Sequence, residues 1–74
     1  MDNQHRQIRG YRELDANDID KMNEIKALGE RLGTMIAELR DTAGYDQRWV
    51  AIANTHLQQG IMAAVRAVAQ PTSF

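Results

Sequence analysis

One stretch of this chain decides its fold: residues 15–42, DANDIDKMNEIKALGERLGTMIAELRDT. Its apolar positions recur at alternating spacings of three and four, which is the pattern of one face of an α-helix. They are Met22, Ile25, Gly29, Leu32, Ile36 and Leu39, and Ile19, Leu28 and Met35 lie beside this stripe. Because such a stripe is unfavourable in water, the rest of the sequence is expected to cover it.

The ends of this helix are marked in the sequence. Asp15 is expected to cap the first turn, with Leu14 and Ile19 placed as a hydrophobic staple. Gly44 is the expected left-handed residue that terminates the helix. We therefore predict a helix over 15–43, about seven turns and roughly 40 Å long.

Two glycines lie one turn apart inside this helix. Gly29 and Gly33 each cost about 1 kcal/mol relative to alanine. Either another backbone or a ligand approaches closely there, or the helix merely tolerates both residues. The sequence alone leaves both interpretations open.

A second helix is expected after a short linker. Asp46 is its predicted N-cap, and Pro71 stops it, because the residue before a proline is biased out of the helical conformation. With so short a linker the two helices should fold back on each other, which predicts an all-α antiparallel two-helix hairpin. The expected organisation is one domain, 1–74, with an N-terminal arm 1–14, helices over 15–43 and 46–69, and a tail 70–74.

The end of the second helix is apolar on nearly all sides. From Trp49 to Phe74 the only formally charged residue is Arg66. A helix that is hydrophobic all round is buried all round, and one partner helix cannot achieve this. We therefore expect several copies of the chain to assemble into a homo-oligomeric helical bundle with an alanine-rich centre.

Composition excludes several classes of protein. The chain has 74 residues, no cysteine and a net charge of −1, which argues against thiolate metal sites, disulfides and the coating of long nucleic acid. No apolar run approaches the roughly 20 residues of a membrane span, so we expect no membrane partner. No glycine-rich phosphate loop, metal-ligand spacing or nucleophile motif is present, and His56 reads as a half-buried helix residue. We expect no metal, no cofactor and no enzymatic activity.

The N-terminal arm carries a basic aromatic segment. Tyr11 follows Gly10 and is flanked by Arg9 and Arg12. Bases stack on tyrosine while guanidinium groups bind phosphate, so the segment is a modest nucleotide-binding signal. The alternative is that Tyr11 only pins the arm against the hairpin.

Arg66 is the other isolated charge. A guanidinium in an apolar surround is costly unless it is paired. In one interpretation Arg66 caps carbonyl groups near the helix end or pairs with an acidic residue of another subunit. In the other, the Arg66 side chains of several symmetry-related copies gather around an anion. The hydroxyl of Thr72 lies nearby in the sequence.

A set of short motifs occurs in a fixed order along nearly the whole chain. It comprises His5-Arg6-x-Ile8-x-Gly10-Tyr11-Arg12-Glu13-Leu14, Ile19-Asp20-x-Met22-Asn23-x-Ile25-Lys26, Asp46-Gln47-Arg48-Trp49, Leu57-Gln58, Arg66-Ala67-Val68-Ala69-Gln70-Pro71 and Phe74. This ordered set resembles the small bacteriophage anti-CBASS sponge proteins with a helical-hairpin domain.

The resemblance implies a phage protein that works in the cytoplasm of the infected bacterium. Such proteins bind and sequester the cyclic oligonucleotides made by host immune synthases, without degrading them, and so block activation of the CBASS effectors. They assemble as homo-hexamers of helical hairpins. Cyclic dinucleotides such as cGAMP bind between subunits, and some members bind cyclic trinucleotides at separate sites.

The resemblance also implies roles for individual residues. Tyr11 matches the base-stacking tyrosine and Lys26 the phosphate-binding lysine of the dinucleotide site, with Arg9 and Gly10 beside them. A possible second site, for a cyclic trinucleotide, is carried over to two residues near the C-terminus, Arg66 and Thr72.

Two other classes remain open at this stage. The chain could be a plain oligomerisation or adaptor hairpin whose partner is another protein. It could also be an RNA-binding helical-hairpin dimer, although its charge balance speaks against this. An enzyme that cleaves the cyclic nucleotide is the least favoured interpretation.

Overall fold

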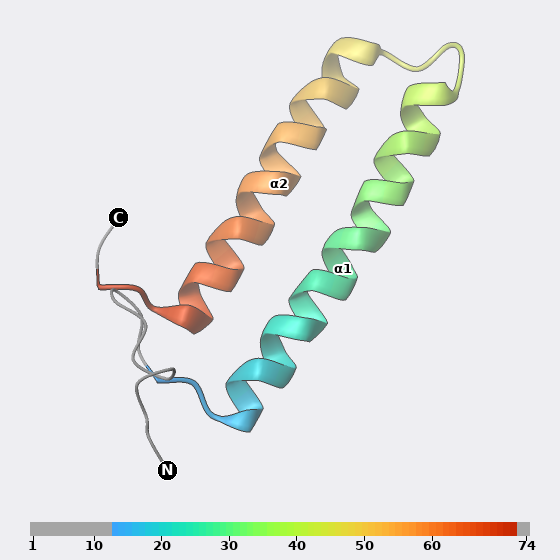
Figure 1. Ribbon diagram of the computed structural model, residues 1–74. Helices are drawn as coiled ribbons and strands as arrows, with labels where there is room; N and C mark the ends of the chain where they lie inside the picture. Colours follow the sequence, from blue (N-terminus) through green and yellow to red (C-terminus); the bar gives the residue numbers. More distant parts are fainter. Residues whose placement is uncertain (1–12, 73–74) are drawn as a thin grey trace.

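The computed structural model describes residues 13–72, which form two long antiparallel helices (Figure 1). Helix α1 spans Ala16–Asp41 and helix α2 spans Gln47–Ala69. The expected bounds were 15–43 and 46–69, so α1 begins one residue later and ends two residues earlier, and α2 begins one residue later. The predicted all-α helical hairpin is confirmed, and within residues 13–72 there is no strand.

Both helices begin at the aspartates expected to cap them. The Asp15 carboxylate accepts a hydrogen bond from the backbone N–H of Asp18 at 2.8 Å, and the Asp18 carboxylate accepts one from the N–H of Asp15 at 3.1 Å. This reciprocal capping box satisfies two backbone donors that the helix itself leaves without partners. At α2, the Asp46 carboxylate accepts from the N–H groups of Arg48 and Trp49, at 3.0 Å and 3.3 Å.

The end of α1 differs from the prediction. Thr42, with an extended backbone (φ −95°, ψ 115°), ends the helix, and its N–H donates to the carbonyl of Leu39. Gly44 does have a left-handed backbone (φ 95°), but it lies two residues beyond this cap and shapes the turn instead. The last carbonyls are satisfied by side chains: the Thr42 hydroxyl donates to Glu38 at 2.7 Å, and the Gln47 amide donates to Leu39 at 3.2 Å.

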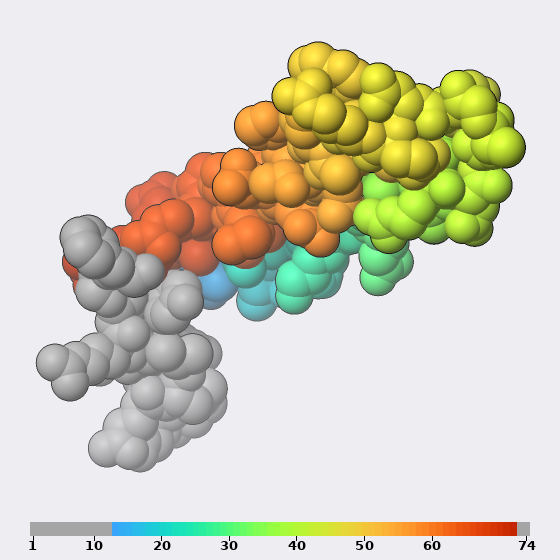
Figure 2. Space-filling view, turned by 90° about the horizontal axis from the view of Figure 1, so that it is seen from above, coloured from blue at the N-terminus to red at the C-terminus, as the bar shows by residue number. Residues whose placement is uncertain are grey.

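A single hairpin buries little apolar surface. Among the described residues, only Ile36, Val50 and Ala69 are buried hydrophobic side chains. Large apolar side chains with exposures from 49% to 69% are Ile19, Leu28, Met35, Tyr45, Trp49 and Met62. Figure 2 shows why: α2 lies over α1, and no third element in the described part of the chain packs on this pair. On α1 the large exposed apolar residues are therefore those beside the stripe, while the stripe itself is half-buried or buried against α2.

Neither helix has the length and apolar composition needed to cross a membrane, as judged over residues 13–72.

The hairpin has two distinct sides. Leu28 and Met35 are seven residues apart and project from the same side of α1. Gly33, near the opposite side of α1, borders the groove described below.

Candidate ligand-binding groove

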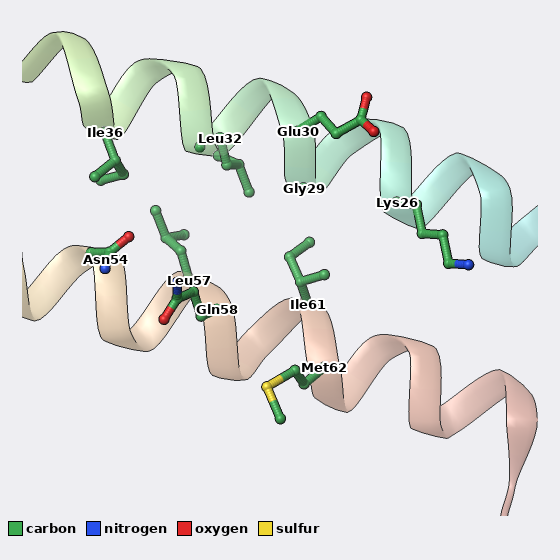
Figure 3. A pocket seen from close by; sticks show the side chains of 11 residues that line it. Lys26, Gly29, Glu30, Leu32, Ile36, Asn54, Leu57, Gln58, Ile61 and Met62 are labelled. Carbon is green, nitrogen blue, oxygen red and sulfur yellow. The ribbon is translucent and has the colours of Figure 1, made fainter.

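A groove with a volume of about 720 Å³ runs along one side of the hairpin, between α1 and α2 (Figure 3). Its floor is apolar because each helix turns two residues one turn apart toward the other helix. These residues are Leu32 and Ile36 on α1, and Leu57 and Ile61 on α2. The volume lies within the range of about 300–1,000 Å³ that small-molecule sites usually have.

The two glycines of α1 have different surroundings. A Cβ atom added at Gly29 would lie 3.3 Å from Cγ2 of Ile61, which is tighter than ordinary van der Waals contact. At Gly33 nothing lies within 4 Å of such an atom among the described contacts. The close approach at Gly29 is thus made by a side chain of the same copy, whereas Gly33 leaves the wall of the groove open.

Lys26 stands at one end of this groove, on α1. It is exposed, and within residues 13–72 its ammonium group makes no ion pair or hydrogen bond. Glu30 is one turn away, but its carboxylate points away from α2 while the Lys26 side chain extends past the groove toward α2 (Figure 3). Lys26 therefore places a positive charge, with no ion-pair partner among residues 13–72, at the end of a largely apolar groove.

The other basic residue of the first turns of α1 has a partner. The Lys21 ammonium donates to the Glu24 carboxylate at 2.7 Å, and this contact raises the pKa of Lys21. The pair is exposed and lies outside the groove lining. Of these two lysines, Lys26 is the one available to an anionic ligand.

Two carboxamide side chains also line the groove. They were not selected from the sequence as candidates for a site. Asn54 and Gln58 lie one turn apart on α2, at the part of the groove far from Lys26. Their positions depend on the register of α2 against α1, in which Ile61 meets Gly29. Helical spacing does place Asn54 on the apolar stripe of α2, four residues after Val50 and three before Leu57. The register then decides which residues of α1 it lies beside.

A second hollow of about 420 Å³ lies at the C-terminal end of α2. Arg66, Ala69 and Pro71 line it, and it shares the side chains of Ile61 and Met62 with the groove. Arg66 thus lines a concave surface that is largely apolar. Its carbonyl accepts a hydrogen bond of 2.7 Å from the N–H of the C-cap residue, which turns the chain out of the helix.

Of the remaining predicted site residues, the structure describes only Thr72. Thr72 is exposed and does not line the second hollow beside Arg66. Arg9, Gly10 and Tyr11 lie outside residues 13–72. Within those residues no group of three or more His, Cys, Asp or Glu side chains could hold a metal ion.

These features define a class of protein: a small helical hairpin with a lateral groove that has an apolar floor and is bordered by Lys26, Glu30 and two carboxamides. A family model, the Acb2/Tad1 hairpin domain, matches residues 3–69. The chain therefore belongs to the Acb2/Tad1 hairpin-domain family, and the family predicted from the ordered motifs is confirmed.

A curated relative supports the same assignment. Anti-CBASS protein 2 of Pseudomonas phage JBD67 is 39% identical over an alignment of 105 positions, which covers 96% of this chain and 97% of the relative. Because this alignment is longer than the 74-residue chain, it includes residues of the relative that have no counterpart here.

Proposed function

We propose that this chain is a phage anti-CBASS protein that binds cyclic oligonucleotide messengers and sequesters them without degrading them. The observation that carries the proposal is Lys26, which has no ion-pair partner among residues 13–72, at the end of a largely apolar groove in a member of this family. The name of the phage JBD67 relative supports the same role. Sequestration requires binding and slow release, and the groove offers groups for binding.

The expected ligand is a cyclic dinucleotide such as cGAMP, which carries two bases and two phosphodiester charges. One Lys26 and one Tyr11 per copy, doubled across a two-fold interface, match this inventory, with Arg9 and Gly10 beside them. Each base–tyrosine stack contributes about 1–3 kcal/mol, and charge-assisted contacts to phosphate add to it.

Assembly follows from the exposed apolar surface of the hairpin. Leu28 and Met35 are half exposed on one side, and Met62 is exposed at the groove on the other. A partner on one side alone would leave the other uncovered, so each copy needs at least two interfaces. We propose a homo-hexamer, in which symmetry-related Arg66 side chains, with Thr72, form a second site for a cyclic trinucleotide. The protein would act in the cytoplasm of the infected bacterium.

The decisive experiment is ligand capture followed by mass spectrometry. The purified protein is incubated with a panel of cyclic di- and trinucleotides, washed and heat-denatured, and the released small molecules are weighed. We expect intact cyclic nucleotides. Release of linear products would indicate hydrolysis, and release of nothing from any member of the panel would refute the proposal.

Variants identify the groups responsible. Lys26→Ala should weaken dinucleotide binding and flatten its dependence on salt, because one charge contact to phosphate is lost. Lys21→Ala is the matched control, since Lys21 is paired with Glu24 outside the groove. Tyr11→Ala should abolish dinucleotide binding while leaving the oligomer intact, and Arg66→Ala should impair trinucleotide binding alone. Calorimetry with each ligand separates these outcomes.

An adaptor hairpin with a protein partner is the second candidate. The observation in its favour is the exposed aromatic pair near the turn, Tyr45 and Trp49, with the Arg48 guanidinium 5.5 Å from the centre of the Trp49 ring. Aromatic residues and arginine are enriched at protein interfaces. A melting temperature that does not rise with any cyclic nucleotide would favour this candidate over sequestration.

A further inference from the structure

Two carboxamides, those of Asn54 and Gln58, line the groove. Within the described residues, neither Asn54 nor Gln58 makes a side-chain hydrogen bond. Asn54 is half-buried, and its carboxamide lies on the side of α2 that faces α1, next to Ile36 (Figure 3). A half-buried amide without a protein partner contributes little to the hairpin, and it costs free energy if an apolar group covers it. A polar group from a ligand would remove that cost.

The order of groups along the groove follows the antiparallel packing of the helices. Lys26 stands at one end, and Asn54 lies near Ile36 at the other. Ten residues of α1 separate Lys26 from Ile36, which is about 15 Å along the helix axis. Leu32, Ile61 and the bare wall at Gly33 lie between them. The groove thus offers a cation, then an apolar floor, then carboxamides, while Glu30, which also lines it, directs its carboxylate away from α2 (Figure 3).

This order matches a nucleotide, which presents a phosphate, then a sugar and the face of a base, then the polar edge of that base. A carboxamide carries a donor and an acceptor side by side. The edge of a purine carries the complementary pair, and the bidentate contact of asparagine or glutamine with adenine uses it. We propose that Asn54, assisted by Gln58, binds the base edge of the nucleotide whose phosphate is bound at Lys26. This inference rests on the proposed function and assigns the residues that recognise the base.

The test pairs a change in the protein with a change in the ligand. The ligands are cyclic di-adenosine monophosphate and the analogue in which purine, lacking the exocyclic amine, replaces both adenines. Asn54→Leu keeps the size of the side chain and removes its polar atoms. We expect it to weaken binding of the adenine ligand about 5- to 150-fold, the range for one bidentate contact. The purine analogue should bind the wild-type protein more weakly and should lose little further affinity in the variant.

Three further variants keep the test decisive. Gln59→Leu is the control, because Gln59 is exposed and lies outside the groove lining. This variant should bind the adenine ligand as tightly as the wild-type protein does. Gln58→Leu should show a smaller loss in the same direction. Should Asn54→Leu fail to fold by circular dichroism, Asn54→Asp replaces it, since it removes the donor at nearly constant shape.

The outcomes separate this inference from the function on which it rests. If the wild-type protein binds the adenine ligand and both Asn54 variants bind it equally well, the base-edge assignment is wrong while sequestration stands. Equal losses for the adenine and purine ligands would also overturn it, because that result indicates a loss of shape rather than of a base contact. If the wild-type protein binds no cyclic nucleotide, both proposals fail. In that case the groove holds something else, such as a helix of another copy.

Discussion

Gly33→Ala tests whether the wall of the groove is as open as the packing indicates. Gly33 lies within α1, and among residues 13–72 nothing lies within 4 Å of a Cβ atom added there. Alanine is favoured over glycine in a helix by about 1 kcal/mol, because it loses less backbone entropy on folding. Because no steric cost opposes it, the whole of this difference should appear as an increase in the free energy of unfolding. For a domain of this size it corresponds to a rise in melting temperature of roughly 4–8 °C.

Gly29→Ala is the matched comparison, one turn earlier in the same helix. The gain in helix propensity is the same, but the new methyl group would lie 3.3 Å from Cγ2 of Ile61. Either Ile61 moves by a few tenths of an ångström or the helices separate slightly, and overpacking typically costs about 1–3 kcal/mol. We therefore expect Gly29→Ala to be neutral or destabilising, and less stable than Gly33→Ala.

The assay is urea unfolding followed by circular dichroism at several protein concentrations, with sedimentation to report the size of the assembly. A loss of stability for Gly33→Ala at every concentration, including those at which single chains predominate, would refute the reasoning. If the loss appears only in the assembled protein, another copy packs against Gly33. In that case the open wall described here belongs to an intersubunit contact.

Three further predictions concern the helix ends and the exposed tryptophan. Asp15→Ala removes the capping box of α1 and should lower the free energy of unfolding by about 1 kcal/mol in urea titrations, whereas Asn17→Ala, exposed in the same turn, should change it little. Gln70→Gly should raise that free energy by about 1 kcal/mol, since Gln70 has a left-handed backbone (φ 47°) that glycine adopts without strain; an unchanged midpoint would contradict this. Trp49, the only tryptophan, is 60% exposed in one copy. If assembly covers it, its fluorescence should shift to longer wavelength when the protein is diluted. A spectrum that does not change on dilution would argue against burial of Trp49 in the assembly.

The hairpin could be predicted because its determinants are local. Asp15 and Asp46 accept hydrogen bonds from backbone groups only two or three residues away, so their capping role can be read from the sequence alone. The apolar period of α1 likewise depends only on spacing within one helix. The end of α1 was predicted less well. Thr42 ends the helix by an extended backbone before Gly44 is reached, and both residues were compatible with a helix end.

The groove could not be predicted because it depends on how one helix is placed along the other. Spacing places Gly29, and not Gly33, on the apolar stripe of α1, but it does not show that Ile61 is the residue that meets Gly29 at close range. Shifting α2 by one turn would bring another residue of α2 to Gly29 and would move Asn54 away from Ile36. Lys26 was selected through the family resemblance rather than through packing.

The course of the hairpin brings Glu13 and Thr72, the outermost described residues, to one end of the molecule, with the turn at 42–46 at the other (Figure 1). Lys26 and Arg66 belong to the half nearer the chain ends. A bulky group attached at Glu13 or Thr72 would therefore crowd the half that carries these cations. The exposed turn, about 40 Å away along the helices, is the better attachment point for labelling, for surface immobilisation or for joining two copies through an inserted linker.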